Sequence, residues 1–256
     1  MPLLQARGVT HYFGGLCAVQ DFNLDLEPGE LVGIIGPNGA GKTTIFNLMT
    51  GVYRATQGSI QFNGTELVGK TPNQITALGI ARTFQTIRLF KDLSVLDNVR
   101  IAHYSRVAYS PVEALLHLGR YGAEERRITE HSMDLLAVLK LDGYADELAK
   151  NLPYGLQRRL EVARALATLP RLLLLDEPAA GMNPAEIGQM MEFIRWVRQQ
   201  FDLTILLIEH QMRLVMGICE RIKVLDFGAT IAEGRPEEIQ HNPKVLEAYL
   251  GEEVTA

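Results

Sequence analysis

The residues best suited to chemistry lie in one glycine-rich segment, Gly36-Pro37-Asn38-Gly39-Ala40-Gly41-Lys42-Thr43-Thr44. Its spacing is G-x-x-x-x-G-K-[ST], and it lies between an apolar run and a helix-like run. Glycines let backbone amides approach phosphate oxygens, and a helix N-terminus adds partial positive charge. The pattern predicts a nucleotide-binding loop in which Lys42 reaches the β- and γ-phosphates and the Thr43 hydroxyl binds Mg²⁺. A glycine-rich turn without a ligand is the alternative, and the flanking elements disfavour it.

Two carboxylates, Asp176 and Glu177, end a second apolar run at 172–175. Ligands of open α/β sheets bind at the carboxyl ends of strands. We therefore expect Asp176 to hold Mg²⁺, through water, and Glu177 to orient or deprotonate an attacking water. Alone, the pair would be read as the polar end of a strand. The phosphate loop shifts the balance towards phosphoryl transfer.

Two further candidates carry a weaker signal. His210 ends the apolar run 203–209, and a strand beside the acidic one would turn it towards the same γ-phosphate. A lone histidine is as often structural. Gln85 follows the segment 80–84, and a lone glutamine has almost no meaning by itself.

The elements that must position these residues alternate in type. Residues 1–65 are predicted to be strand-rich, and 86–155 have helical spacing. Asn183-Pro184-Ala185-Glu186 has the pattern of a helix N-cap, and the helix should run to about residue 200. Further strands are predicted at 171–176, 203–209 and 221–228. This alternation predicts a mainly parallel sheet covered by helices.

The composition excludes several classes of protein. The net charge of −5 gives no argument for binding nucleic acid or an anionic membrane. Cys17 and Cys219 match no metal-ligand spacing, which favours a reducing compartment. The longest apolar runs are far short of the roughly 20 residues that span a bilayer, and no signal layout follows Met1. We expect a soluble chain that another protein would anchor at a membrane.

The order of these motifs along the chain resembles that in the nucleotide-binding subunit of ABC transporters, and the resemblance covers nearly the whole chain. The resemblance implies an α/β P-loop NTPase with a RecA-like parallel-sheet core, an N-terminal antiparallel β subdomain and an α-helical signature subdomain. It implies one domain, 1–256, with the ATPase core and β subdomain at 1–85 and 165–256, and the helical subdomain at 86–164.

The resemblance also implies ATP and Mg²⁺ as cofactors and assigns roles to residues. Phe13, with Tyr12 as the second choice, would stack on adenine, and Gln85 would sense the γ-phosphate and report to a membrane partner. The catalytic residues that it implies are Glu177, His210 and Lys42. The metal-binding residues that it implies are Thr43, Gln85 and Asp176.

A segment at 152–157 departs from the family pattern. The family has Leu-Ser-Gly-Gly-Gln there, at a helix N-terminus that faces ATP on the opposite subunit. Here the corresponding residues are Pro153, Tyr154, Gly155 and Gln157. Pro153 has neither a hydroxyl nor an amide hydrogen, so we expect a weakened half-site. Arg158 and Arg159 would add charge nearby, although such arginines are usually a solvated face. Asn183 is a second departure, because many members have aspartate there.

A narrower resemblance covers the segments 81–102, 154–166, 177–184, 206–228 and 246–253. They are similar to the LivG-type ATP-binding subunit of high-affinity branched-chain amino acid importers. This implies uptake of leucine, isoleucine and valine from a substrate-binding protein. The implied partners are two transmembrane permease subunits and a second related ATP-binding subunit, or a second copy of this chain. The implied place is the cytoplasmic face of the plasma membrane, as a peripheral protein.

Three alternatives stay open. The same ATPase would serve another cargo, namely urea, amides, other amino acids or lipopolysaccharide export, although Tyr154-Gly155 argues against the export type. A soluble ABC ATPase of translation or DNA repair is disfavoured by the single ATPase unit and the negative charge, so no nucleic-acid partner is expected. A regulatory module without turnover is disfavoured by Glu177 together with His210.

Overall fold

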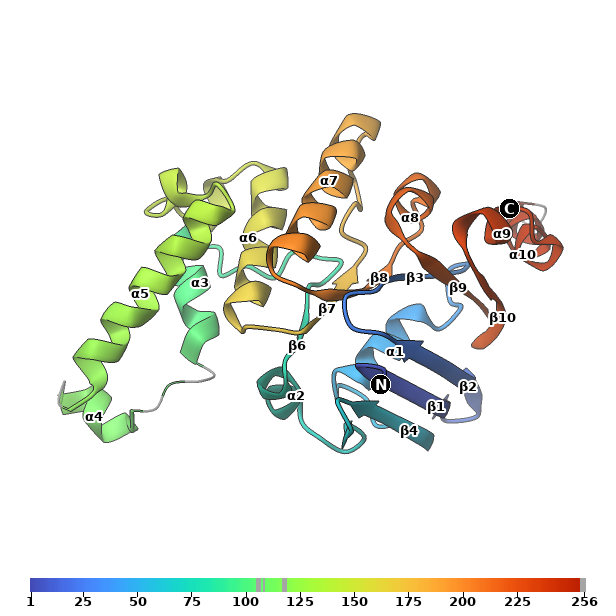
Figure 1. Cartoon of the computed structure of the whole chain (residues 1–256), viewed down its shortest axis with the longest axis horizontal. Coiled ribbons are helices and arrows are strands. Elements are labelled where there is room, and N and C mark those ends of the chain that lie inside the picture. Colours follow the sequence, from blue (N-terminus) through green and yellow to red (C-terminus); the bar gives the residue numbers. More distant parts are fainter. Residues whose placement is uncertain (105–106, 108, 117–118, 254–256) are drawn as a thin grey trace. The chain divides into compact units, whose positions relative to one another are not determined.

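The computed structural model describes residues 1–104, 107, 109–116 and 119–253. By contacts, the chain divides into two compact units, 1–85 with 171–256, and 86–170 (Figure 1). The boundary at 170 lies after helix α6 (Tyr154–Ala167), which continues unbroken through residue 164.

A six-stranded sheet forms the centre of the first unit. Its strands are β3 (Leu31–Ile35), β6 (Ile80–Arg82), β7 (Leu172–Asp176), β8 (Thr204–Ile208), β9 (Arg221–Asp226) and β10 (Ala229–Gly234). The order is β10-β9-β3-β8-β7-β6, and every neighbouring pair is parallel except β9 with β10. All residues of β3, β7 and β8 are buried, which explains their continuous apolar sequences. The carboxyl ends of the five parallel strands therefore meet at one edge.

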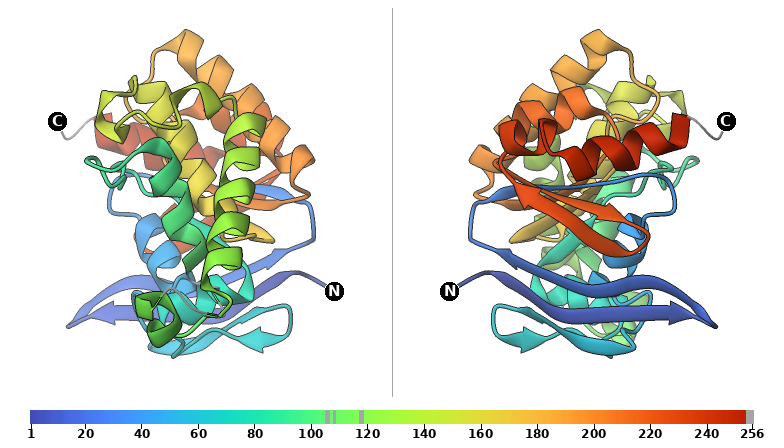
Figure 2. Two further views of the ribbon diagram at one scale, coloured as in Figure 1. Left: turned by 90° about the vertical axis from the view of Figure 1, so that its left-hand side faces the viewer. Right: turned by 90° about the vertical axis from the view of Figure 1, so that its right-hand side faces the viewer.

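A second, antiparallel sheet completes the β structure of this unit. It has the order β2-β1-β4-β5, formed by β1 (Leu4–Phe13), β2 (Leu16–Leu26), β4 (Gln57–Phe62) and β5 (Thr65–Glu66). Phe22, Leu24 and Leu26 alternate with more exposed residues and point into the core, as successive side chains of a strand point to opposite faces. Figure 2 shows this sheet as a separate layer.

The described residues of the same unit also form six helices. They are α1 (Lys42–Met49), α2 (Pro72–Leu78), α7 (Pro184–Gln200), α8 (Met212–Ile218), α9 (Pro236–Gln240) and α10 (Pro243–Glu253). In Figure 1, α7 and α8 cover one face of the parallel sheet and α1 covers the other. The predicted start of α7 is confirmed, since the Asn183 side chain accepts from the Ala185 and Glu186 amides and Glu186 accepts from the Asn183 amide.

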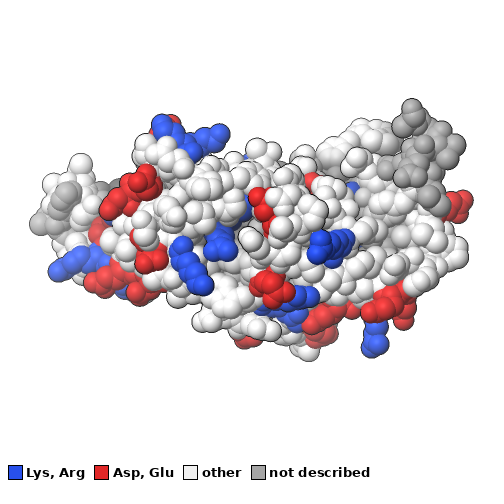
Figure 3. Space-filling view, turned by 90° about the horizontal axis from the view of Figure 1, so that it is seen from above, with Lys and Arg blue, Asp and Glu red and all other residues white. Residues whose placement is uncertain are grey.

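The second unit is helical. It contains α3 (Val95–His103), α4 (Pro111–Leu116), α5 (Tyr121–Val138) and α6, with short 3₁₀ turns at Asp142–Tyr144 and Ala149–Asn151. Helix α3 packs against both α5 and α6. Among the described residues, no helix is both long and apolar enough to cross a bilayer. On the face drawn in Figure 3, basic and acidic side chains lie interspersed.

Candidate nucleotide-binding site

The glycine-rich loop connects β3 to α1 and lies tightly against neighbouring backbone. Gly36 has φ 150°, and a Cβ there would lie 2.1 Å from the Leu225 carbonyl oxygen. Gly41 has φ 97°, and a Cβ there would lie 2.4 Å from the Ala18 oxygen. Only glycine fits at these two places, because any side chain would enter the backbone of β9 or β2. The loop is therefore held in one shape by its surroundings.

Positive charge gathers inside this loop. The buried Lys42 ammonium donates to the Gly36 oxygen at 2.6 Å and the Pro37 oxygen at 2.7 Å. Helix α1 begins just here, with Gly41 as its N-cap, no side-chain cap and no acidic residue in its first turn. Asn38, Gly39 and Thr43 are exposed around it. An uncapped helix N-terminus beside an ammonium favours a bound anion such as a phosphate.

The acidic pair lies at the end of β7, which is separated by β8 from β3, the strand that leads into the loop. Glu177 has φ 47°, a left-handed conformation that is uncommon outside glycine and turns the chain sharply out of the strand. Its amide donates to the Ile208 oxygen of β8 at 2.9 Å, which holds the turn. Strained backbone of this kind costs on the order of 1–3 kcal/mol and concentrates at functional sites.

The structure brings Gln85 and His210 to Glu177. The Gln85 Nε2 donates to the Glu177 Oε2 at 2.7 Å. The His210 Nδ1 lies 3.4 Å from the same oxygen, and about half of the histidine side chain is exposed. Three residues separated by up to 125 positions in the sequence therefore meet at one carboxylate oxygen. Parallel strand order is the cause, since β6, β7 and β8 are adjacent and end at the same edge.

Arg82 is a residue of this site that the sequence analysis missed. Its Nη2 lies 2.7 Å from the Asp176 Oδ2, with both side chains almost fully buried, at 6% and 4% exposed. The Nη1 donates to the Asn47 Oδ1 of α1 at 2.7 Å. The guanidinium also lies over the rings of Phe46 and Phe84. In the sequence, the only indication of this role was that Arg82 is a charged residue at the end of an apolar segment, three positions before Gln85.

Glu209 was missed as well. Its side chain is fully buried and accepts hydrogen bonds from the amides of Ala179, His210 and Gln211. Burial raises the pKa of this carboxyl, against the lowering effect of those three amides. The sequence offered one sign, a glutamate at the end of an otherwise apolar run.

The aromatic candidates lie on the hairpin between β1 and β2. Phe13 is exposed and makes edge contacts with His11 at 4.7 Å and with Tyr53 at 5.2 Å between ring centroids. Tyr12 is also exposed, and a hydrogen bond with Cys17 raises its pKa. Because Ala18 of the same hairpin touches the phosphate loop at Gly41, this hairpin borders the loop. Tyr53 gave no signal in the sequence.

Oxygen ligands suited to Mg²⁺ lie in this unit. Thr43 supplies a hydroxyl, Gln85 an amide oxygen and Asp176 a carboxylate, of which Oδ2 is engaged by Arg82. No group of three His, Cys, Asp or Glu side chains that would hold a metal occurs among the described residues. The donor set fits a magnesium ion that is carried mainly by nucleotide phosphates and water.

In the helical unit, the segment 152–157 begins α6. Pro153 is the N-cap, without a side-chain cap, and its carbonyl accepts from the Leu156 and Gln157 amides. The Gln157 side chain turns back to the Leu152 oxygen at 2.8 Å. Gly155 is exposed, and nothing lies within 4 Å of where its Cβ would be.

The interpretation of Arg158 as part of a solvated face is wrong. Its side chain is 3% exposed, and it pairs with the buried Glu161 at 3.1 Å. Two of its nitrogens donate to the Tyr154 hydroxyl, at 2.9 Å and 3.2 Å, and its guanidinium lies over the Tyr154 ring. Tyr154 thus has a structural role, because its hydroxyl accepts hydrogen bonds from a buried arginine one turn further along α6.

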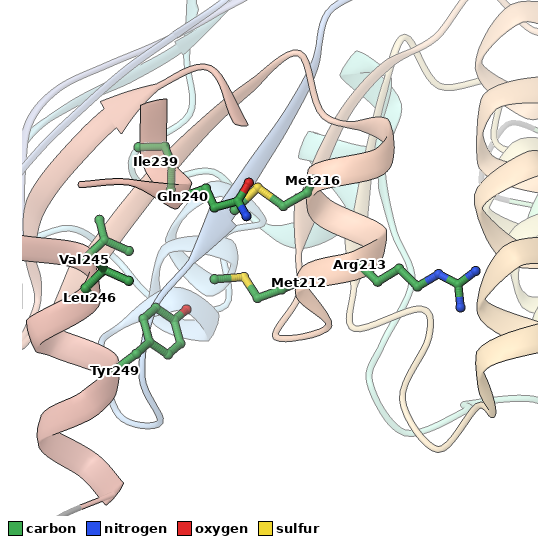
Figure 4. Close-up of a pocket in the computed structure, with 8 residues that line it drawn as sticks. All are labelled: Met212, Arg213, Met216, Ile239, Gln240, Val245, Leu246 and Tyr249. Carbon is green, nitrogen blue, oxygen red and sulfur yellow. The ribbon is translucent and has the colours of Figure 1, made fainter. Parts of the chain in front are cut away.

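Two concave regions lie outside the acidic edge. One, of about 760 Å³, is lined by the phosphate loop, the β9–β10 turn and α10 through Pro37, Asn38, Gly39, Ala40, Asp226, Phe227, Ile231, Lys244, Glu247 and Ala248. The other, of about 340 Å³, lies between α8, α9 and α10. Figure 4 shows its mainly apolar lining, including Met212, Met216 and Tyr249, with the Arg213 side chain directed away. Neither region holds the carboxylates described above.

Comparison with known proteins decides the family. The family model described as "ABC transporter" matches residues 19–180, more than half of the chain. The chain belongs to the ABC transporter family, as an ATP-binding subunit. The family and the P-loop NTPase fold predicted from the sequence are confirmed. A second model, described as "Branched-chain amino acid ATP-binding cassette transporter", matches residues 229–255 of this ABC ATPase.

Individual relatives of this ABC ATPase agree with that assignment. The chain is 45% identical to the high-affinity branched-chain amino acid transport ATP-binding protein LivG of Escherichia coli K12, over 98% of each chain. It is 43% identical to the corresponding protein BraF of Pseudomonas aeruginosa, again over 98% of each. Its structure is similar to the ADP conformation of MJ1267, an ATP-binding cassette of an ABC transporter, with a TM-score of 0.85 and 32% identity over 98% of this chain and 99% of the other.

Proposed function

We propose that this ABC ATPase hydrolyses ATP at the carboxyl edge of its parallel sheet and thereby drives the uptake of branched-chain amino acids through a membrane permease. The observation that carries the hydrolytic part is the meeting of Gln85 and His210 at the Glu177 carboxylate. The cargo is supported by the names of LivG and BraF and by the family match at 229–255.

Nucleotide binding is assigned to the phosphate loop and the bordering hairpin. Backbone amides of 36–44 and the N-terminus of α1 would hold the phosphates, and Lys42 would exchange its two carbonyl partners for phosphate oxygens. Phe13, whose ring makes edge contacts with His11 and Tyr53, is proposed to stack on adenine. Thr43, Gln85 and Asp176 would hold Mg²⁺, which when bound offsets the negative charge of the phosphates.

Hydrolysis is assigned to the cluster at Glu177. Its carboxylate would orient or deprotonate the attacking water, with His210 and Gln85 fixing its position. The conformation of Glu177 directs the carboxylate out of the strand end, where the chain leaves the sheet. Arg82 would prevent Asp176 from turning away, because the guanidinium is itself fixed by Asn47 and two aromatic rings.

Membership of the ABC family supports a proposal for the partners. The N-terminus of α6, at Pro153, Tyr154, Gly155 and Gln157, is proposed to complete the ATP site of a second ATP-binding subunit, related or identical. Two transmembrane permease subunits would anchor the pair at the cytoplasmic face of the plasma membrane, and a substrate-binding protein would deliver the cargo. Pro153 leaves this half-site without a hydroxyl and weakens it.

The catalytic assignment is tested with Glu177→Gln. This variant should bind ATP like the wild type but lose roughly 10²–10⁴-fold in hydrolysis, the range of a lost general base. Fluorescent-nucleotide titration and phosphate release measure the two quantities. Glu192→Gln, which alters an exposed carboxylate on α7, is the matched control and should hydrolyse ATP normally. Wild-type turnover in Glu177→Gln would remove Glu177 from this role.

The cargo is tested in the native cell, by uptake of labelled leucine with Glu177→Gln at the chromosomal locus. Lost uptake with normal growth on rich medium supports the importer. Normal leucine uptake would contradict the proposed cargo and leave the ATPase assignment standing. Labelled urea, amides and other amino acids would then be the next substrates to compare.

A further inference from the structure

Glu209 is a buried carboxylate to which the proposed mechanism gives no part. It lies between β8 and His210, and its side chain is 0% exposed. Burying a carboxylate away from water is unfavourable unless hydrogen bonds compensate it, and an apolar residue of similar volume would fill the space at lower cost. Its presence therefore calls for a structural reason beyond packing.

The hydrogen bonds of Glu209 join two loops. Its Oε1 accepts from the Ala179 amide at 2.8 Å, in the loop that follows Glu177. Its Oε2 accepts from the amides of His210 at 3.0 Å and Gln211 at 3.1 Å, in the loop that follows β8. The two loops are 30 residues apart in the sequence, and one side chain connects their backbones.

These two loops carry the proposed catalytic pair. Ala179 is two residues after Glu177, and His210 is next to Glu209. The His210 Nδ1 lies 3.4 Å from the Glu177 Oε2 and 3.9 Å from the Glu209 Oε2, so one imidazole nitrogen is close to both carboxylates. On the strand side, the Glu177 amide already bonds the Ile208 oxygen. Glu209 adds the second attachment, beyond the strand ends.

We propose that Glu209 is a positioning residue for ATP hydrolysis, which fixes His210 relative to Glu177 by joining the backbones of their two loops. This inference rests on the proposed function, in which those two residues act at the γ-phosphate. One attachment is the bond from the Glu177 amide to the Ile208 oxygen, and the other is the bond from the Ala179 amide to Glu209. Together they prevent the two loops from rotating about the strand ends. The buried carboxylate suits this task because its two oxygens accept hydrogen bonds from several amides at once and donate none.

The first test is Glu209→Gln. Glutamine has the same size but places an NH₂ group where a carboxylate oxygen accepted, so at least one amide loses its partner. A small displacement of His210 should lower kcat about 10–10²-fold, as misplacement of a catalytic group does. KM and the affinity for ATP should stay within about twofold, since the phosphate loop is untouched. Unchanged kcat would overturn the proposal.

A double variant separates positioning from general destabilisation. If Glu209 acts through His210, then Glu209→Gln should lower kcat by less than about threefold when added to His210→Ala. Losses that multiply would indicate a purely structural role and overturn the proposal. Glu30→Gln is the matched control, because Glu30 also accepts from a backbone amide and an arginine but lies at the opposite end of the sheet.

A measurement on the wild type covers the case in which Glu209→Gln does not fold. Hydrogen exchange of the Ala179, His210 and Gln211 amides should be as slow as in β7 and β8, and the three should open together. Exchange at the rate of an exposed loop would overturn the proposal. Lost turnover in Glu177→Gln and His210→Ala, but not in Glu209→Gln, defeats this inference alone. Wild-type turnover in the first two defeats the proposed function and this inference with it.

Discussion

The acidic edge of the parallel sheet and the N-terminus of α6 differ in where their charged side chains point. At the sheet edge, Glu177 is held in a left-handed conformation with His210 and Gln85 against it, at the border of solvent. At the helix, Arg158 is turned inward and is satisfied by Tyr154 and Glu161. In the first region the exposed functional groups are side chains. In the second they are the backbone amides at the N-terminus of a helix.

The difference shows how buried charge supports each kind of site. Behind the sheet edge, Arg82 and Glu209 hold the groups proposed to react. Within α6, the buried Arg158 and Glu161 pair with each other, and Glu161 also accepts from the Arg88 amide of the same unit. The proposed contact with the opposite ATP is made by the exposed N-terminus of the helix. Variants of the supporting residues should therefore affect both stability and turnover in the first region, and stability alone in the second.

The largest effect is expected for Arg82→Met. Removal of the guanidinium leaves the buried Asp176 carboxylate unpaired, and the free energy of unfolding should fall by about 3–5 kcal/mol. Urea denaturation measures the change. Adding Asp176→Asn should recover more than half of the loss, because the unpaired charge is then absent. Arg195→Met, which breaks an exposed pair on α7, should change stability by less than about 1 kcal/mol.

A medium effect is expected for Tyr154→Phe. The ring still covers Arg158, but two guanidinium hydrogen bonds to the Tyr154 hydroxyl are lost, and stability should fall by about 1–3 kcal/mol. The ATP affinity of the isolated subunit should not change, since its phosphate loop is in the other unit and α6 is proposed to face the ATP of a second subunit. Urea denaturation and nucleotide titration check both statements, with the exposed Tyr144→Phe as control. A loss of ATP affinity without loss of stability would contradict the structural role assigned to Tyr154.

The smallest change in stability is expected for Pro153→Ser. A serine hydroxyl would cap α6, a gain of about 1 kcal/mol, while loss of the proline ring frees the unfolded chain by a similar amount. Net stability should therefore change by less than about 1 kcal/mol. Turnover should rise about 2- to 10-fold, because the hydroxyl adds one hydrogen bond at the opposite ATP. Pro170→Ser serves as the control, and unchanged turnover would show that Pro153 does not weaken the half-site.

Much of the fold was predictable because its signals are local. The apolar runs of β3, β7 and β8 and the capping box of α7 each follow from neighbouring residues. Arg158 was not predictable in this way. Its spacing on α6 is equally compatible with solvent, and only packing against the rest of the helical unit placed it inside.

The phosphate loop, the acidic strand end and the family could be predicted from the amino-acid sequence, because glycine spacing and motif order are properties of the chain. Tertiary structure alone decided that Gln85, Glu177 and His210 share one oxygen atom, since this depends on the order of β6, β7 and β8 in the sheet. It also decided the partners of Arg82 and Glu209. A buried charge is stable only beside a compensating group, and that group lies elsewhere in the sequence.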